Sequence, residues 1–250
     1  MREASSEFPI MKIDAMDYDN PAARLLALLE EGKKLPNQGC RAAWDILLKT
    51  DGDISLLMSR LGTLYALPAL ILKNLQESFP AHVPKSAYWR TQVNKGFMSQ
   101  NLGSDWSTFI GHIDEHTLNY LALTAEILQS KATTKTIADT QILEVRAQIE
   151  AIYKEVRTTD NLSSEIRTYL AHYLSKILNS IDEYFLTGAF PLLETTSALL
   201  GHAFLDDKYR SFLRDEELGG RIFECLTAMA NVVTVAVGLP QLTQALALLK

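Results

Sequence analysis

The stretch that decides the fold is 226–249, LTAMANVVTVAVGLPQLTQALALL. It contains no charged residue, and its 24 residues are about the length that a helix needs to cross the hydrocarbon core of a membrane. Five polar or small residues recur in it at steps of three and four, which places them on one helix face: Thr227, Asn231, Thr234, Gly238 and Gln241. A surface helix of a soluble protein usually carries charges on its polar face. An uncharged polar face therefore indicates a helix that packs against protein or lies in a membrane.

Three structures are open for this stretch. It can form a pair of core helices broken at Pro240, it can insert into a membrane, or it can be an oligomerisation helix whose polar face meets its own copies. The last two combine if the oligomer makes a pore. Thr227, Asn231 and Thr234 would then line the pore, and the neighbouring valines would face lipid.

The rest of the chain predicts an all-α fold, a multi-helix bundle that ends in this apolar helical segment. No stretch sustains the alternation of apolar and polar residues that indicates a half-buried strand. Apolar residues instead recur at threes and fours, most regularly over two consecutive helices. The first carries Ile137, Ile142, Val145, Ile149, Ile152 and Val156, and the second carries Ile166, Leu170, Tyr173, Leu174, Ile177, Ile181 and Tyr184.

Caps and breaks give local expectations in the first half of the chain. Asn20 followed by Pro21 predicts the start of a helix, and Gly32 predicts its end. Pro68 predicts a kink or break in a later helix. Because 61–72 carries no charge, we expect that helix to be buried.

Composition divides the chain into three parts. Residues 1–19 are expected to form an amino-terminal arm, and 20–131 an amino-terminal helical bundle. A carboxy-terminal helical region follows over 132–250, with its apolar tail over 222–249. The boundary is placed near 131–135, where the composition shifts from apolar to charged.

Charge and cysteine content limit the partners. The formal net charge is −6, with 24 basic and 30 acidic residues, so nucleic acid is an unlikely partner unless a local basic face exists. No cofactor motif is present. The amino terminus has no continuous apolar core of a secretory signal, and the two cysteines are isolated. We expect a cytoplasmic protein, associated with the inner membrane if the tail inserts.

One motif can be read as a metal site. His112, Glu115 and His116 match the pattern H-x-x-E-H. If 104–131 forms one long helix, the two imidazoles lie one turn apart on one face of it. There they can chelate zinc, with Glu115 as general base. Glu194 is a candidate third ligand. The alternative is a partly exposed polar face on a packed helix.

A second motif has the form Arg-x4-His, with Arg167 and His172 near the start of a helix that follows a long helix. It resembles the signature of HEPN-domain ribonucleases, which are helical bundles and often dimers. In that family the arginine and the histidine act on the scissile phosphate of RNA. The position directly after the arginine is usually polar in that family, and Thr168 is a weak fit to it. The alternative is that Arg167 pairs with Glu165 or a neighbouring helix, with His172 on the surface.

A third candidate is a nucleophilic thiol. Cys40 follows Gly39 near a helix start, where a thiol pKa can fall. A buried structural cysteine is the alternative. The chain contains no G-x-S-x-G, P-loop or G-x-G-x-x-G motif that would add another catalytic site.

The last third resembles a pattern in uncharacterised helical bacterial proteins of defence islands, several of them suspected anti-phage effectors. A regular helix leads to a glycine, a second short helix and a hydrophobic tail. The matching residues are Leu174, Ile177, Ile181, Tyr184, Gly188, Leu192, Leu199 and Gly201, with the tail from Leu226. The resemblance implies a non-enzymatic effector that oligomerises and perturbs or forms a pore in a membrane. Its partners would be its own copies, the membrane and a regulatory protein or nucleotide-type ligand.

Overall fold

Helices make up the regular structure of this chain, which a computed structural model describes over residues 19–132, 134–159 and 162–238. Its α-helices are α1 (Pro21–Lys34), α2 (Cys40–Leu48), α3 (Ile54–Ser78), α4 (Ala87–Ser99), α5 (Ser107–Ile110), α6 (Glu115–Gln129), α7 (Asp139–Thr158), α8 (Ser164–Asp182), α9 (Tyr184–Thr187), α10 (Phe190–Gly201), α11 (Asp207–Asp215) and α12 (Glu217–Val237). Short 3-10 helices are η1 (Pro80–His82), η2 (Pro84–Ser86) and η3 (His202–Phe204). In the described ranges the β-type pairing is limited to one bridge, between Gly39 and Asp105. The predicted all-α fold is confirmed.

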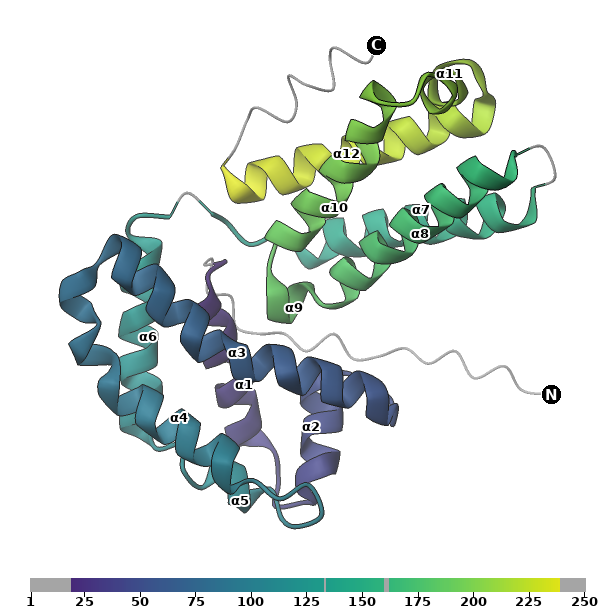
Figure 1. The fold of residues 1–250 in the computed structure, drawn as a ribbon. Coiled ribbons are helices and arrows are strands. Elements are labelled where there is room, and N and C mark those ends of the chain that lie inside the picture. Colours follow the sequence, from purple (N-terminus) through teal and green to yellow (C-terminus); the bar gives the residue numbers. More distant parts are fainter. Residues whose placement is uncertain (1–18, 133, 160–161, 239–250) are drawn as a thin grey trace.

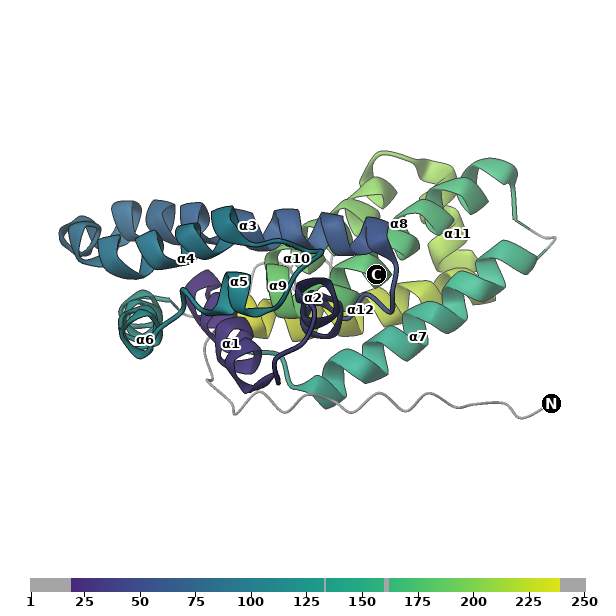
Figure 2. The same ribbon diagram turned by 90° about the horizontal axis from the view of Figure 1, so that it is seen from below.

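The helices gather into two groups (Figure 1). Helices α1–α6 form the first group, in which α3 and α4 make one outer layer over α1, α2, α5 and α6 (Figure 2). Helices α7, α8 and α10–α12 form the second group, where α7 and α8 run side by side. Each group has its own hydrophobic core, and the change from the first core to the second lies between Leu128 and Ile137.

The first core is centred on aromatic rings. The centroids of Trp44 and Trp106 are 4.8 Å apart, with the rings nearly perpendicular, and Phe109 lies 4.6 Å from Trp44. Both indoles satisfy their buried N–H groups. Trp44 donates to Oε1 of Gln100 at 2.8 Å, and Trp106 donates to the carbonyl of Gly32 at 2.9 Å. These contacts bring α1, α2 and α5 together.

The second core is mainly aliphatic and follows the two predicted amphipathic faces. The buried residues of these faces are Ile137, Val145, Ile149, Ile152, Val156, Leu170, Leu174, Ile177, Ile181 and Tyr184. Helix α12 adds Ile222, Leu226, Met229, Val233 and Val237 from the other side. The apolar carboxy-terminal helix is therefore a core element of the second group on one of its faces.

A buried polar cluster joins the two groups. Arg24 on α1 forms an ion pair with Asp19, whose carboxylate also accepts a hydrogen bond from the amide of Ala189 at 3.2 Å. The hydroxyl of Tyr184 accepts a hydrogen bond from the amide of Ile137 at 2.9 Å. Gly188, with φ +75°, leaves no space for a Cβ beside the Arg24 guanidinium. The start of α1 is thereby held against the α9–α10 turn.

The expected helix starts are present, but two expected helix ends are not. The side chain of Asn20 accepts from the amides of Ala22 and Ala23, so it caps α1 as predicted. Helix α1 continues past Gly32 to Lys34, and a Cβ on Gly32 would lie 3.0 Å from the Trp106 ring. Glycine is present there for close packing. Helix α3 runs without interruption through Pro68, which is buried within it, so of the kink or break expected there the break does not occur.

The expectation that 61–72 is buried is wrong as well. Only 33% of the most apolar stretch of α3 is buried, because one face packs on the first core while the other meets solvent. Met58, Tyr65 and Leu70 are exposed to 46%, 52% and 42%. Absence of charge thus marks an apolar surface here, not a core helix.

The amino-terminal arm, apart from Asp19, and the end of the apolar tail lie outside the described residues.

Two adjacent glycines in α12 give a matched test of the α11–α12 packing. A Cβ on Gly219 would overlap the backbone carbonyl of Phe212, whereas a Cβ on Gly220 would meet nothing within 4 Å. We expect Gly219→Ala to lower the free energy of unfolding by about 2 kcal/mol or more. Gly220→Ala should leave it unchanged or raise it by up to about 1 kcal/mol, because alanine favours the helix. Urea unfolding of both variants measures this, and equal effects would contradict the packing.

The buried ion pair gives a second test. Arg24→Met leaves the Asp19 carboxylate buried without a counter-charge, and we expect a loss of about 3–5 kcal/mol in the free energy of unfolding. The double variant with Asp19→Asn removes that uncompensated charge and should recover part of the loss. Urea unfolding of the single and double variants completes the cycle. If the effects of the two substitutions simply add, the two side chains are not coupled and the stabilising ion pair is contradicted.

Candidate functional site

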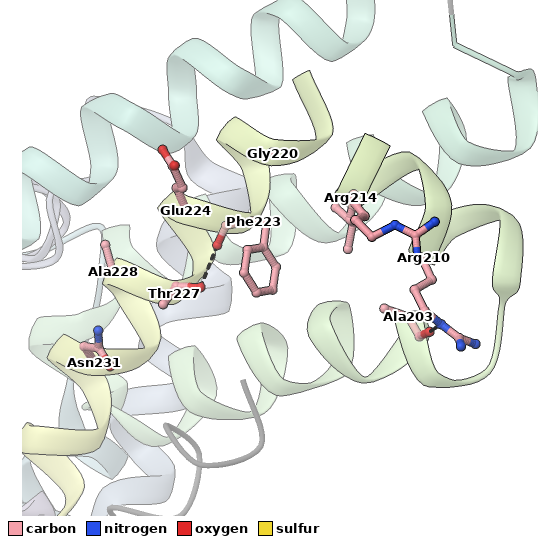
Figure 3. Close-up of a pocket in the computed structure, with 10 residues that line it drawn as sticks. Ala203, Arg210, Arg214, Gly220, Phe223, Glu224, Thr227, Ala228 and Asn231 are labelled. Carbon is pink, nitrogen blue, oxygen red and sulfur yellow. Dashed lines mark hydrogen bonds between the residues drawn. The ribbon is translucent and has the colours of Figure 1, made fainter. Parts of the chain in front are cut away.

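The most distinctive surface feature of the second group is a groove between α11 and α12 (Figure 3). Its volume is about 520 Å³. The lining residues are Ala203, Arg210, Leu213, Arg214, Gly220, Phe223, Glu224, Thr227, Ala228 and Asn231. Six of them recur at threes and fours along α12, so they form one straight strip on its solvent side. This groove contains two residues of the predicted polar face.

The predicted five-residue face is only partly open. Thr227 and Asn231 line the groove, but Thr234 is 4% exposed and its hydroxyl bonds to the carbonyl of Ala230. The connection before α7 lies against this end of α12, since the amide of Lys135 donates to the carbonyl of Ala236 at 2.7 Å. Thr234 is therefore inside the fold and does not extend the open strip. Gly238 ends α12 in the left-handed conformation, and Gln241 lies outside the described residues.

The polar groups of the groove differ in what they can still bind. Arg210 donates to the carbonyl of Ala203 at 2.9 Å and pairs with Asp207, while Arg214 pairs with its neighbour Asp215. The Thr227 hydroxyl donates to the carbonyl of Phe223. Among the described residues, the side-chain amide of Asn231 has no hydrogen-bond partner. This amide and the exposed Glu224 carboxylate, which likewise forms no ion pair with a described residue, are thus the groups of the strip that are free to bond to another molecule.

The described residues that line this groove include no cysteine thiol. The nearest thiol, Cys225, is buried, and burial raises its pKa to about 11. The same cause raises the pKa of Cys40, so the expectation of a lowered thiol pKa at that helix start is wrong. Both thiols are protonated at neutral pH and behave as small apolar side chains.

The H-x-x-E-H residues do not share a helix. Helix α6 begins only at Glu115, and Asp114 is its cap, accepting from the amide and hydroxyl of Thr117 at 2.7 Å. His112 lies in the turn before the cap, so the imidazoles do not leave one helix face. His116 packs against the Tyr88 ring, 6.3 Å between centroids. In the described residues no three His, Cys, Asp or Glu side chains, Glu194 included, gather as a metal site.

Arg167 and His172 face different surroundings. Nη2 of Arg167 donates to the carbonyls of Thr159 and Leu162, at 2.6 Å and 3.4 Å, and so ties the start of α8 to the end of α7. His172 is exposed, as expected for a surface residue, and lines a shallow hollow with Glu165. Five positions separate the two residues, about 140° around the helix. Arg167 thus supports the loop between the helices instead of facing the hollow.

The sequence did not single out the residues opposite α12. Arg210 and Arg214 lie on one side of α11 while Tyr209, Phe212 and Leu213 are buried on the other. The signal for this orientation is the amphipathic pattern of 207–215, which places both arginines away from the core. That pattern does not reveal the groove, because the groove depends on how α11 folds back on α12.

The cap of α6 gives a pH-dependent prediction. A hydrogen bond from Tyr88 is the main cause that lowers the pKa of Asp114 from 3.8 to about 2. The stability contributed by this carboxylate is complete above about pH 4 and is lost as the pH falls towards 2. Tyr88→Phe should move the pKa back towards 3.8, as measured by NMR titration of the carboxyl group. His112→Ala is the control and should not move it. An unchanged pKa in Tyr88→Phe would contradict the assignment.

The strip along α12 is the site that the geometry favours, because it combines an open surface with a free amide. Comparison with known proteins adds nothing to this choice, since no family model, no curated protein and no solved structure matches the chain.

Proposed function

We propose that the chain is a non-enzymatic bacterial effector, of the anti-phage type that the last third resembles. In this proposal it oligomerises through α12 and, once assembled, perturbs or forms a pore in the inner membrane from the cytoplasmic side. The observation that carries the proposal is the character of α12. This helix is long and apolar enough to cross a membrane, yet half of its most apolar stretch is not buried in the fold.

The dimensions of α12 support a membrane role. Its 21 residues extend over about 32 Å, close to the thickness of a hydrocarbon core. Its charged residues are confined to the amino-terminal turns, since none follows Glu224. Val235 is 73% exposed, so the uncharged part reaches solvent as well as the core. A helix of this kind can exchange protein contacts for lipid or for another copy of itself.

The open strip supports self-assembly. Gly220, Thr227 and Ala228 are small and let a second helix approach closely, which is how helices associate in membranes. Asn231 supplies an amide that can pair with the same amide of another copy. A polar residue at such a position also fixes register and oligomer size. The proposed partners are therefore copies of the chain and the bilayer, with a regulatory protein or a nucleotide-type ligand as the trigger.

Substitution of Asn231 tests the proposal. The residue is exposed, so we expect Asn231→Leu to leave the thermal unfolding midpoint unchanged. It should reduce ion leakage from liposomes at least tenfold, because the amide no longer pairs between copies or lines the pore. Dye release and light scattering measure leakage and oligomer size.

Asn179→Leu is the matched control, because Asn179 is an exposed asparagine on α8, outside the groove. It should leak like the wild type. His172→Ala should also leave leakage unchanged, and RNA cleavage by the wild type that this variant loses would favour the ribonuclease interpretation instead. Equal leakage by Asn231→Leu and the wild type would contradict the proposed role of α12.

A further inference from the structure

The outer layer of the first helix group presents an apolar surface that the function of α12 does not use. Met58, Gly62, Tyr65, Ala69 and Lys73 follow at steps of four, three, four and four, so they share the solvent face of α3. The layer, formed by α3 and α4, stands at the outside of the molecule (Figure 2).

Helix α4 continues this surface. Met98 is 76% exposed, and its sulfur lies 4.0 Å from the Tyr65 hydroxyl. The Tyr65 ring also packs edge-on against the buried Phe97, 5.3 Å between centroids. Tyr65 is thereby fixed between the two helices with half of its surface in solvent. The apolar surface is built into the fold and spans both helices.

The same segment is basic in an acidic protein. Between Ile54 and Ser104 there are five basic residues against one acidic residue, Glu77, although the whole chain has a net charge of −6. One of the five, Arg60, is buried and bonds to the carbonyls of residues 48 and 49. Lys85 and Lys95 are exposed, and neither forms an ion pair with any described residue. The positive charge is available to a partner.

We propose that this α3–α4 surface binds the anionic headgroup layer of a lipid bilayer, with α3 lying in the plane of the interface. The exposed side chains of Met58 and Met98 would enter the acyl boundary, and Tyr65 suits the headgroup depth. Lys85 and Lys95 would attract acidic lipids, each contributing severalfold to the affinity near the surface. Apolar area combined with basic charge is what such peripheral binding requires.

Charge also decides against a second copy as the occupant. A twofold contact places the same patch on both partners, so the lysines of one copy would meet those of the other. Such a contact sets like charges together, whereas acidic lipid headgroups complement them. The proposal goes beyond the function of α12, because binding to the membrane surface requires neither assembly nor insertion.

Flotation with liposomes of phosphatidylcholine alone, or containing about a third phosphatidylserine, tests the proposal with the full chain. We expect binding to the anionic vesicles that weakens as salt rises, and much weaker binding to the neutral vesicles. Lys85→Gln with Lys95→Gln should weaken anionic binding about tenfold or more. Met58→Gln with Met98→Gln should weaken it similarly, while both double variants keep the wild-type unfolding midpoint because all four residues are exposed.

Matched controls separate this surface from general charge and from α12. Lys176→Gln with Lys208→Gln removes two exposed lysines of the second group and should bind like the wild type. Asn231→Leu should also float like the wild type, even where it fails to leak. A wild type that floats but never leaks would overturn the proposed function and leave this surface standing.

Four results would overturn the surface assignment. The first three are the absence of wild-type binding to anionic vesicles, equal binding to neutral vesicles, and wild-type binding by the Lys85/Lys95 or Met58/Met98 double variant. A dimer in solution that Met58→Gln dissociates would identify a second copy as the occupant and would equally overturn it.

Discussion

The ion pair between Arg24 and Asp19 is the constraint on which the arrangement of the two helix groups depends. Burial disfavours the charged guanidinium and lowers the pKa of Arg24, with Asp19 acting in the opposite sense. A charge kept in such a place has to be paired, and the partner carboxylate is held in turn by the amide of Ala189. The beginning of α1 and the α9–α10 turn, distant in sequence, are therefore fixed together, and Leu186 of α9 packs into the first core.

Fixing the two groups together leaves each with one apolar helix that is only partly covered. Helix α3 packs one face on the aromatic core and turns Met58 and Tyr65 outwards, and α12 does the same on the aliphatic core with Val235. In both helices the buried face supplies the stabilisation, so the outer face is free to remain apolar. Scattered apolar side chains are ordinary on a surface, but exposed apolar side chains on uncharged stretches of a helix are typical of contact with lipid or protein.

The sequence predicts those features that depend on neighbours along the chain. Asn20 caps α1 because its side chain bonds to amides two and three residues on. The regular spacing in α7 and α8 likewise identifies their buried faces. Features that depend on distant contacts are missed. Gly32 lies inside a helix and packs against Trp106, and Asp114 caps α6 in place of the expected helical turn. Thr234 is buried, and the connection before α7 bonds to the carbonyl of Ala236 beside it. The uncharged run 61–72 fits a core helix and a lipid-facing one equally well.

The two proposed surfaces imply an order of events. The strip on α12 is open while the opposite face, with Leu226, Met229 and Val233, stays in the second core, so assembly through the strip needs no unfolding. Insertion of α12 is different, because it takes those side chains out of the core. Moving each of them from the core into water would cost about 1.5–3 kcal/mol of free energy. Hydrocarbon removes most of that cost, since lipid is as apolar as the core. In the proposed function the release of α12 would therefore cost less at a bilayer than in water, and the proposed α3–α4 surface would hold the chain there first.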